Sequence, residues 1–321
     1  KKPSDYFNTK LYTGNGSTQS ITGIGHQPDL VWTKGRNDTY SQMWVDAVRG
    51  GTKYIYSNTT VAEATNANAI TSFISDGYNI GSFGTLNDNS QAYVSWNWKE
   101  TATAGFDIVS YTGNGSAGKT VAHNLGVVPQ MIIVKRYNDG TASWMVYHHK
   151  LGTTNPSDKY LSLDTTAAQD NGGWNSTMPT SSVFTVSADQ RVNANGASYI
   201  AYVFSEKQGY SKFGSYTGNG STDGTFVYTG FKPAFVIIKN TGATVNWLLK
   251  DNKRPSYQNI NDTNIYPNVN AVEETSNDTD FLSNGFKARN TGSYQNASGN
   301  NYIYMAFASE PLVGDNPATA R

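Results

Sequence analysis

The sequence Tyr-Thr-Gly-Asn-Gly-Ser occurs three times, at residues 12–17, 111–116 and 216–221. The copies begin about 100 residues apart, far more than the roughly 20–50 residues of a solenoid repeat. A spacing of this length fits a small domain present in three tandem copies. Asn and Gly reach positive φ at low cost, so Asn-Gly after a β-forming Tyr predicts a strand that ends in a tight turn.

Further landmarks recur in the same order in each copy. A Gly-x-x-Pro sequence opens an apolar run that ends in Lys, at 25–34, 126–135 and 230–239. Pro is tolerated at the start of a strand, and an apolar run after it predicts a strand buried on both faces. A Trp follows each Lys, and each copy then closes with an aromatic strand; the Trp residues are Trp44, Trp144 and Trp247, and the closing strands are 93–98, 199–204 and 302–307.

These patterns predict an all-β protein of three tandem antiparallel β-sandwich domains, with a jelly roll favoured by strand count. The predicted domains are 1–104, 105–208 and 209–310, followed by an extended tail at 311–321. The linkers between them are only a few residues long, so we expect the domains to pack against one another. The chain begins Lys-Lys-Pro rather than Met, as a fragment of a longer protein or a processed product would.

Composition narrows the classes of partner. The 24 basic and 24 acidic residues cancel, so net charge predicts neither a nucleic-acid surface nor an anionic membrane partner. The chain has no Cys, which excludes disulfides and thiolate metal sites. No apolar run approaches the roughly 20 residues of a membrane helix. We expect no cofactor, no metal and no membrane insertion.

Trp44 begins the sequence Trp-Val-Asp-Ala-Val-Arg-Gly-Gly, the sharpest local constellation in the chain. Its Asp46 and Arg49 are either an ion pair that shapes a loop or a pair that binds a ligand, since Arg forks fit carboxylates in both settings. The second and third copies are not expected to keep the pair, which indicates that the domain itself does not require it.

Two further candidates lie in the second copy. His148 and His149 are adjacent, so in a strand they would point to opposite faces, which favours a polar strand end over a metal site. Trp174 lies in Asn-Gly-Gly-Trp-Asn, within a variable polar region at 150–182. Its ring either stacks on a sugar or packs against its own domain. The candidate ligand-binding residues are therefore Trp44, Asp46, Arg49, His148 and Trp174.

Catalysis is not expected. The chain has only six Glu, of which Glu100, Glu206 and Glu310 lie at the ends of the copies. A glycosidase needs two carboxylates about 5–10 Å apart, and no such pair is marked. No Ser–His–Asp spacing, phosphate loop or zinc motif is present.

The hexapeptide, the Gly-x-x-Pro run and Trp-Val-Asp-Ala-Val-Arg-Gly together resemble a repeated β domain of tailed bacteriophages. Residues 147–152 and 174–181 resemble the second copy of that pattern, and 310–321 resembles the C-terminus of such proteins. The resemblance covers nearly the whole chain and implies a lectin-like jelly roll in a virion or tail-associated protein, with no catalytic residues to transfer. The third copy lacks the His-His and Trp-Asn sequences, so a ligand site there would have to differ.

The resemblance and the triplication predict a non-enzymatic structural protein of a phage particle. It would be part of an exposed fibre, spike or other surface appendage, bound to other virion proteins and placed where it can contact the host cell surface. A homotrimer is favoured, and one chain forming a pseudo-threefold disc is the alternative. The rival hypothesis is an adhesin module that binds a glycan or receptor through the variable loops. A capsid decoration protein and a glycan depolymerase are the remaining alternatives.

Overall fold

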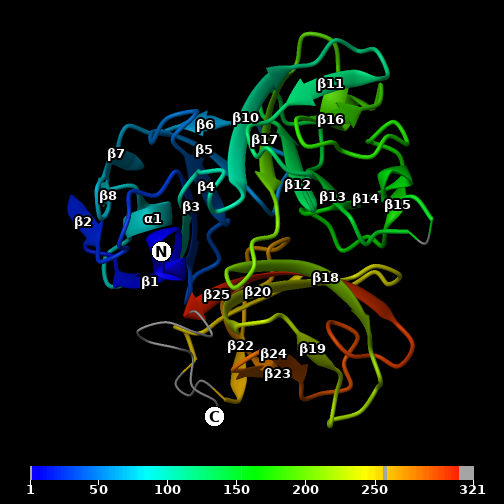
Figure 1. The fold of residues 1–321 in the computed structure, drawn as a ribbon. Coiled ribbons are helices and arrows are strands. Elements are labelled where there is room, and N and C mark those ends of the chain that lie inside the picture. The colour runs from blue at the N-terminus through cyan, green and yellow to red at the C-terminus, as the bar shows by residue number, and fades with distance from the viewer. Residues whose placement is uncertain (1, 153, 256–258, 311–321) are drawn as a thin grey trace.

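The computed structural model describes residues 2–152, 154–255 and 259–310. The strands are antiparallel, and within these ranges the helices are short: α1 (Gly84–Asn87), α2 (Gln190–Asn193) and the 3-10 segments η1 (Pro3–Asp5) and η2 (Pro156–Asp158). In Figure 1 the strands form three lobes around a common centre. None of the helices in the described ranges is long and apolar enough to cross a membrane. The predicted tail at 311–321 lies outside the described residues.

Three large sheets share one strand order. In each, the first strand pairs with the last, and the last pairs with the apolar strand that follows the Gly-x-x-Pro sequence. The orders are β1 (Phe7–Thr13), β9 (Ala92–Trp98), β3 (Leu30–Gly35), β4 (Met43–Asp46), β5 (Lys53–Tyr56), β6 (Ala64–Thr65); β10 (Phe106–Thr112), β17 (Ser198–Phe204), β12 (Met131–Arg136), β13 (Met145–His148), β14 (Lys159–Ser162), β15 (Asp170–Asn171); and β18 (Ser211–Thr217), β25 (Asn301–Glu310), β20 (Lys232–Asn240), β21 (Leu248–Asp251). We call 2–104, 105–208 and 209–310 repeats 1, 2 and 3.

A second sheet packs against each large one; it has fewer strands than its partner in repeats 1 and 2, and equally many, four, in repeat 3. The second sheets are β2 (Gln19–Thr22), β8 (Gly77–Ile80), β7 (Ile70–Ile74); β11 (Lys119–Ala122), β16 (Val183–Val186); and β19 (Phe226–Tyr228), β24 (Gly285–Ala288), β23 (Glu274–Leu282), β22 (Asn261–Asn264). Each pair of sheets encloses its own cluster of buried side chains. The predicted all-β sandwich architecture is therefore confirmed. The jelly-roll variant and the division into three domains stay predictions.

The large sheets are buried on both faces, as the apolar runs predicted. In β3, Val31 packs inside repeat 1, whereas its neighbour Trp32 faces the centre of the molecule. The same alternation places residues of all three repeats in one shared central core, which includes Trp32, Ile133 and Ile237. The three large sheets therefore meet around a common apolar centre, and each repeat contributes one wall of it.

The repeated hexapeptide holds a buried Asn. The backbone N–H of Asn15 donates to Oδ1 of Asn87, at the end of α1, at 2.8 Å. The bond recurs in the other repeats, from Asn114 to Asn193 at 2.8 Å and from Asn219 to Asn296 at 3.1 Å. Gly14 permits the approach, because a Cβ there would lie 2.1 Å from the carbonyl oxygen of Asp88. The most repeated sequence in the chain thus fastens the turn before the closing strand.

Candidate functional site at the repeat interfaces

Backbone hydrogen bonds join the three repeats in a closed cycle. Glu63 of repeat 1 donates its N–H to the carbonyl oxygen of Tyr137 of repeat 2 at 2.8 Å. Gln169 of repeat 2 donates to Thr241 of repeat 3 at 2.9 Å, and Glu273 of repeat 3 donates to Arg36 of repeat 1 at 2.7 Å. The three acceptors each follow the apolar strand of their repeat. The same backbone contact therefore recurs at all three junctions between repeats.

A second cycle of bonds involves the side chains that directly precede β4, β13 and β21. Trp144 Nε1 donates to the carbonyl oxygen of Tyr56 at 3.0 Å, and Trp247 Nε1 donates to that of Ser162 at 2.9 Å. The third member is Gln42, whose Nε2 donates to the carbonyl oxygen of Tyr266 at 2.6 Å. Each of these bonds links one repeat to the preceding one in the cycle.

This register corrects the predicted correspondence of the Trp residues. Asp46 lies opposite Leu30 in the pairing of β3 with β4, and Asp251 lies opposite Phe235 in the pairing of β20 with β21. His148 holds the same position opposite Met131 in repeat 2. The residues four positions before Asp46, His148 and Asp251 are Gln42, Trp144 and Trp247, so these three are counterparts, and Trp44 lies two residues after Gln42. In repeat 1 the side-chain amide of Gln42 therefore makes the bond to a neighbouring repeat that the indoles of Trp144 and Trp247 make in repeats 2 and 3.

Trp44, Asp46 and Arg49 form the interface between repeats 1 and 2. Asp46 and Arg49 are buried and form an ion pair at 2.6 Å, and Arg49 reaches Glu63 at 3.1 Å. The Tyr202 hydroxyl of repeat 2 donates to Asp46 at 2.8 Å. Trp44 packs edge-on against the Tyr202 ring, with centroids 4.8 Å apart. Burial opposes the charge of Arg49, but Tyr202, Asp46 and Glu63 beside it raise the pKa of the guanidinium above its ordinary value.

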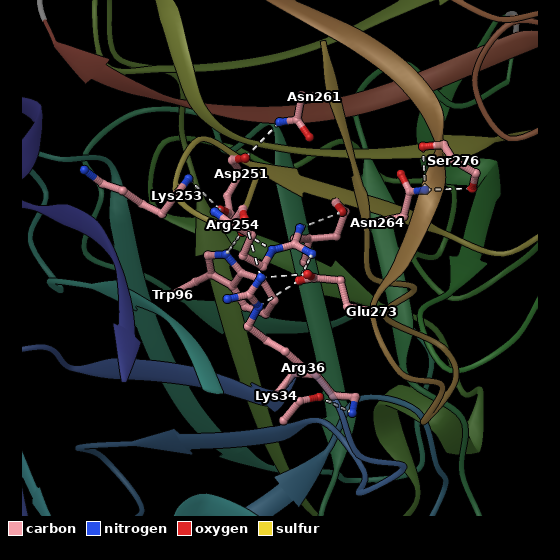
Figure 2. Close-up of polar contacts among 12 residues, drawn as sticks. Lys34, Arg36, Trp96, Asp251, Lys253, Arg254, Asn261, Asn264, Glu273 and Ser276 are labelled. Carbon is pink, nitrogen blue, oxygen red and sulfur yellow. Dashed lines mark hydrogen bonds and ion pairs between the residues drawn. The ribbon is translucent and has the colours of Figure 1, made fainter. Parts of the chain in front are cut away.

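Repeat 3 carries the same ion pair at its interface with repeat 1, contrary to the expectation that only the first copy has it. Arg254 contacts Asp251 at 2.5 Å and Glu273 at 3.1 Å. From repeat 1, Trp96 Nε1 donates to Asp251 at 3.0 Å, and Arg36 contacts Glu273 at 2.7 Å. Figure 2 shows these five side chains converging from the two repeats. The Asp–Arg–Glu set is thus a property of two interfaces out of three.

The interface between repeats 2 and 3 replaces this set with His148, Leu151 and Gln169. His148 is buried; its Nδ1 accepts the N–H of Lys150 at 3.2 Å, so Nε2 carries the proton and donates to the carbonyl oxygen of Tyr304 at 3.2 Å. Burial lowers the pKa of His148 well below its ordinary value, and the neighbouring His149 adds to the shift. His149 Nε2 lies 3.0 Å from the carbonyl oxygen of Phe213. Both imidazoles therefore contact the backbone of repeat 3.

Trp174 lies in the core of repeat 2. Its side chain is 1% exposed and packs edge-on between Tyr147 and Phe184, with ring centroids at 5.8 and 6.4 Å. Close by, Asp158, Asn171 and neighbouring residues line an open hollow of about 550 Å³. The ring itself offers no exposed face to a sugar. The side chains of all five predicted ligand-binding residues are buried, four of them at repeat interfaces, and their binding role stays a prediction.

The Lys that ends each apolar run also serves the interfaces. Lys135 Nζ donates to the carbonyl oxygen of Thr60 in repeat 1 at 2.7 Å, and Lys239 Nζ donates to that of Thr166 in repeat 2 at 2.9 Å. Lys34 instead contacts Asp38 within its own repeat at 3.3 Å. Burial lowers the pKa of Lys135 and that of Lys239 to about 8 each. The recurrence of this Lys predicted a repeat, but not that its ammonium group reaches the neighbouring one.

The charged groups of the two Asp–Arg–Glu sets are paired with one another, and the interface Lys side chains donate to carbonyl oxygens. Nowhere in the described ranges do three or more His, Asp or Glu side chains gather as a metal site would require. Sequence reasoning missed Gln42, Arg36, Arg254 and Glu273. One signal was available: Gln42 follows Lys34 by eight residues, as Trp247 follows Lys239.

The sequence of the chain matches one family of proteins. Residues 2–311 of the chain match a family model described as a domain of unknown function, DUF7483. No curated protein matches the chain.

Proposed function

The chain belongs to the DUF7483 family, and we propose that it is a non-enzymatic structural protein of a tailed-phage particle. In this proposal it forms part of a fibre, spike or other exposed appendage, bound to other virion proteins and positioned to meet the host surface. The assignment to a phage particle rests on the resemblance of the repeated motifs to a β domain of tailed phages. The observation that carries the structural role is the closed cycle of Glu63, Gln169 and Glu273 bonds, which joins three repeats into one body.

The shared core supports a rigid building block rather than three flexibly tethered modules. Aromatic side chains from repeats 1, 2 and 3 meet there, among them Trp98, Phe204 and Phe307. The Phe307 ring lies 5.7 Å from the Trp98 ring and 6.2 Å from the Phe204 ring, centroid to centroid. Aromatic contacts of this kind add to the stabilisation by burial. Separating any two repeats would expose this surface to water.

The buried charges favour cohesion over catalysis. A catalytic carboxylate must reach a substrate, whereas Asp46 and Asp251 are completely buried and bonded to Arg49 and Arg254. A single chain already supplies threefold pseudosymmetry, which supports the disc alternative to a homotrimer. Trimerisation of whole chains remains part of the proposal, and the mass of the particle-free protein in solution tests it.

Immunogold labelling of intact phage particles tests the proposed function. Antibody raised against the folded chain is expected to label fibres or the tail tip, and antibody absorbed with the purified protein is the control. Label spread over the head would replace the appendage with a capsid decoration role. Particles that carry no label, and whose peptides do not include this chain by mass spectrometry, would contradict the proposal.

A further inference from the structure

We propose that the cavity where the linkers between repeats meet, together with the exposed aromatic face of β19, binds an acidic saccharide. The cavity is about 710 Å³ and receives residues from η1, from both linkers and from the end of β19. It is distinct from the buried interface residues described above. The inference rests on the proposed host contact only for the source of the saccharide, because the binding surface is argued from its own residues.

Two aromatic side chains on β19 face solvent. Phe226 is 43% exposed and Tyr228 is 61% exposed, and the residue between them, Val227, is buried. Alternate residues of a strand lie on one face about 6.6 Å apart. The Phe226 ring extends over Gly285 of β24, where a Cβ would lie 3.0 Å from the ring edge. The absence of a side chain at Gly285 therefore leaves room for a flat apolar surface beside the strand.

The other two repeats show that the fold does not require aromatic residues there. Val227, Ile21 and Val121 are the equivalent buried residues, because each pairs with an aromatic residue of the neighbouring strand. The positions before them hold Phe226, Ser20 and Thr120, and the positions after them hold Tyr228, Thr22 and Ala122. Repeats 1 and 2 carry small side chains on this face, so the exposed rings of repeat 3 are not explained by stability.

Tyr228 joins this face to the cavity. It lines the cavity together with Tyr6 and Tyr210, whose rings meet edge-on at 6.0 Å. Tyr210 is 8% exposed, and its hydroxyl is buried without a hydrogen-bond partner. That hydroxyl is closed off from the cavity, so the polar groups open to a ligand are those of the rest of the lining, such as Lys2, Glu206 and Lys207. Sugars combine apolar ring faces with many hydroxyls, which matches an aromatic face beside a cavity lined by polar and charged groups.

The charge of the lining selects an anionic ligand. Lys2, Lys207 and Lys212 line the cavity, against one carboxylate, Glu206. Glu206 lies 2.6 Å from Lys212. The lining is therefore positive in a protein whose net charge is 0. A concentration of one sign of charge in a concave site attracts the opposite sign, so a saccharide that carries carboxylates or sulfates fits better than a neutral one.

A panel of immobilised hexasaccharides tests the proposal with the protein of residues 1–321. The acidic members are hexamers of galacturonate, of mannuronate and of heparin, and the neutral members are methyl-esterified galacturonate hexamer and maltohexaose. We expect at least one acidic hexamer to bind, with an affinity that falls as salt is added. Equal binding of a neutral and an acidic hexamer, or binding of no acidic hexamer, would overturn the proposal.

A double variant locates the site. Phe226→Ser with Tyr228→Thr introduces the residues of repeat 1 at these positions, so the fold is expected to persist, and its melting temperature checks this. Affinity should fall at least about tenfold, equivalent to 1.4 kcal/mol. Tyr40→Ser removes another exposed aromatic ring, 41% exposed, and should leave affinity unchanged. Unchanged affinity in the folded double variant would overturn the site. Particle labelling without saccharide binding rejects the site alone, and saccharide binding without particle labelling rejects only the virion role.

Discussion

The carbonyl oxygen of Arg36 accepts the N–H of Glu273 at 2.7 Å, and the side chains of the same two residues form an ion pair at 2.7 Å. They are 237 positions apart in the chain. This contact joins the third repeat to the first. In linear repeat arrays each unit touches only its sequence neighbours, whereas here every repeat touches both others. Stability is consequently expected to depend on all three interfaces together.

Removing the cation from the interface of repeats 3 and 1 should be strongly destabilising. Arg254→Leu leaves Asp251 buried without its ion pair, which costs about 3–5 kcal/mol. Urea unfolding followed by circular dichroism measures the loss. A triple variant, Asp251→His, Arg254→Leu and Glu273→Gln, copies the uncharged set of repeat 2 and should recover part of the stability, since these sites are coupled. A triple variant less stable than Arg254→Leu alone would show that the two interfaces are not interchangeable.

Two Trp to Phe substitutions separate a hydrogen bond from packing. Trp144→Phe removes the donor to the part-buried carbonyl oxygen of Tyr56, at a cost of about 1–3 kcal/mol. Trp44→Phe is the matched control, because Trp44 is equally buried but its Nε1 has no hydrogen-bond partner. We expect the first variant to lose more unfolding free energy than the second. Equal losses would mean that the interface bond contributes nothing.

His148 should make the protein less stable in acid. Burial holds its folded pKa well below the ordinary 6.5, so its stabilising effect is complete above pH 6.5 and decreases as pH falls below that value toward the folded pKa. The slope is at most about 1.4 kcal/mol per pH unit. His148→Gln keeps an N–H donor without titrating.

Unfolding midpoints of the two proteins at pH 7.5 and pH 5 measure this effect. His26, His123 and His149 also have lowered pKa values, so both proteins should lose stability in acid, the variant less than the parent. Parallel losses in the two proteins would remove His148 as a cause.

Repeat 2 alone, residues 105–208, should not fold. In the whole protein its Ile133, Trp144 and Phe204 are covered by the other repeats in the shared core. A fragment would expose them to water, and burial of apolar area is the dominant stabilising contribution to folding. We expect the NMR spectrum of the fragment to show the narrow range of amide proton shifts that is typical of an unfolded chain. We expect the whole chain to melt in one transition. A folded, monomeric fragment would instead support three independent domains.

Tryptophan fluorescence tests whether Trp174 is a sugar platform. All seven Trp, including Trp174, are among the largest fully buried side chains. Emission should therefore be blue-shifted and quenched poorly by iodide, and Trp174→Phe should leave the quenching unchanged. Strong iodide quenching that disappears in Trp174→Phe would place this ring at the surface and revive the predicted role.

The repeat architecture was readable from the sequence because local rules repeat with it. The Asn-Gly turns, the Pro before each apolar run and the aromatic closing strands are constraints on backbone and burial, and they act within short segments. The buried face of the large sheets could be predicted, since runs such as Leu30–Gly35 have no polar alternation. What these runs pack against on their second face could not be read from them.

The interfaces were harder to predict because they depend on contacts between distant segments. Asp46 and Arg49 were recognised as a pair, but only the fold reveals that Tyr202 of the next repeat completes it. Arg36 and Glu273 carry no local motif, and a neutral composition gives no sign that charges gather at two interfaces. The aromatic pair of Phe226 and Tyr228 is visible in the sequence, but its exposure becomes meaningful only beside its small counterparts in repeats 1 and 2.

Closure of the cycle also limits how a gene for such a protein can change. Open arrays tolerate gain or loss of a unit by unequal recombination, because the new neighbour presents the same contact surface. Here the bond from Glu273 returns to Arg36 only after three units have turned around the shared core. Deleting one repeat would expose the core-facing sides of the other two large sheets, and adding one would move the large sheets apart. Repeat number is therefore expected to be inherited as a fixed trait, while variation accumulates in the outward loops.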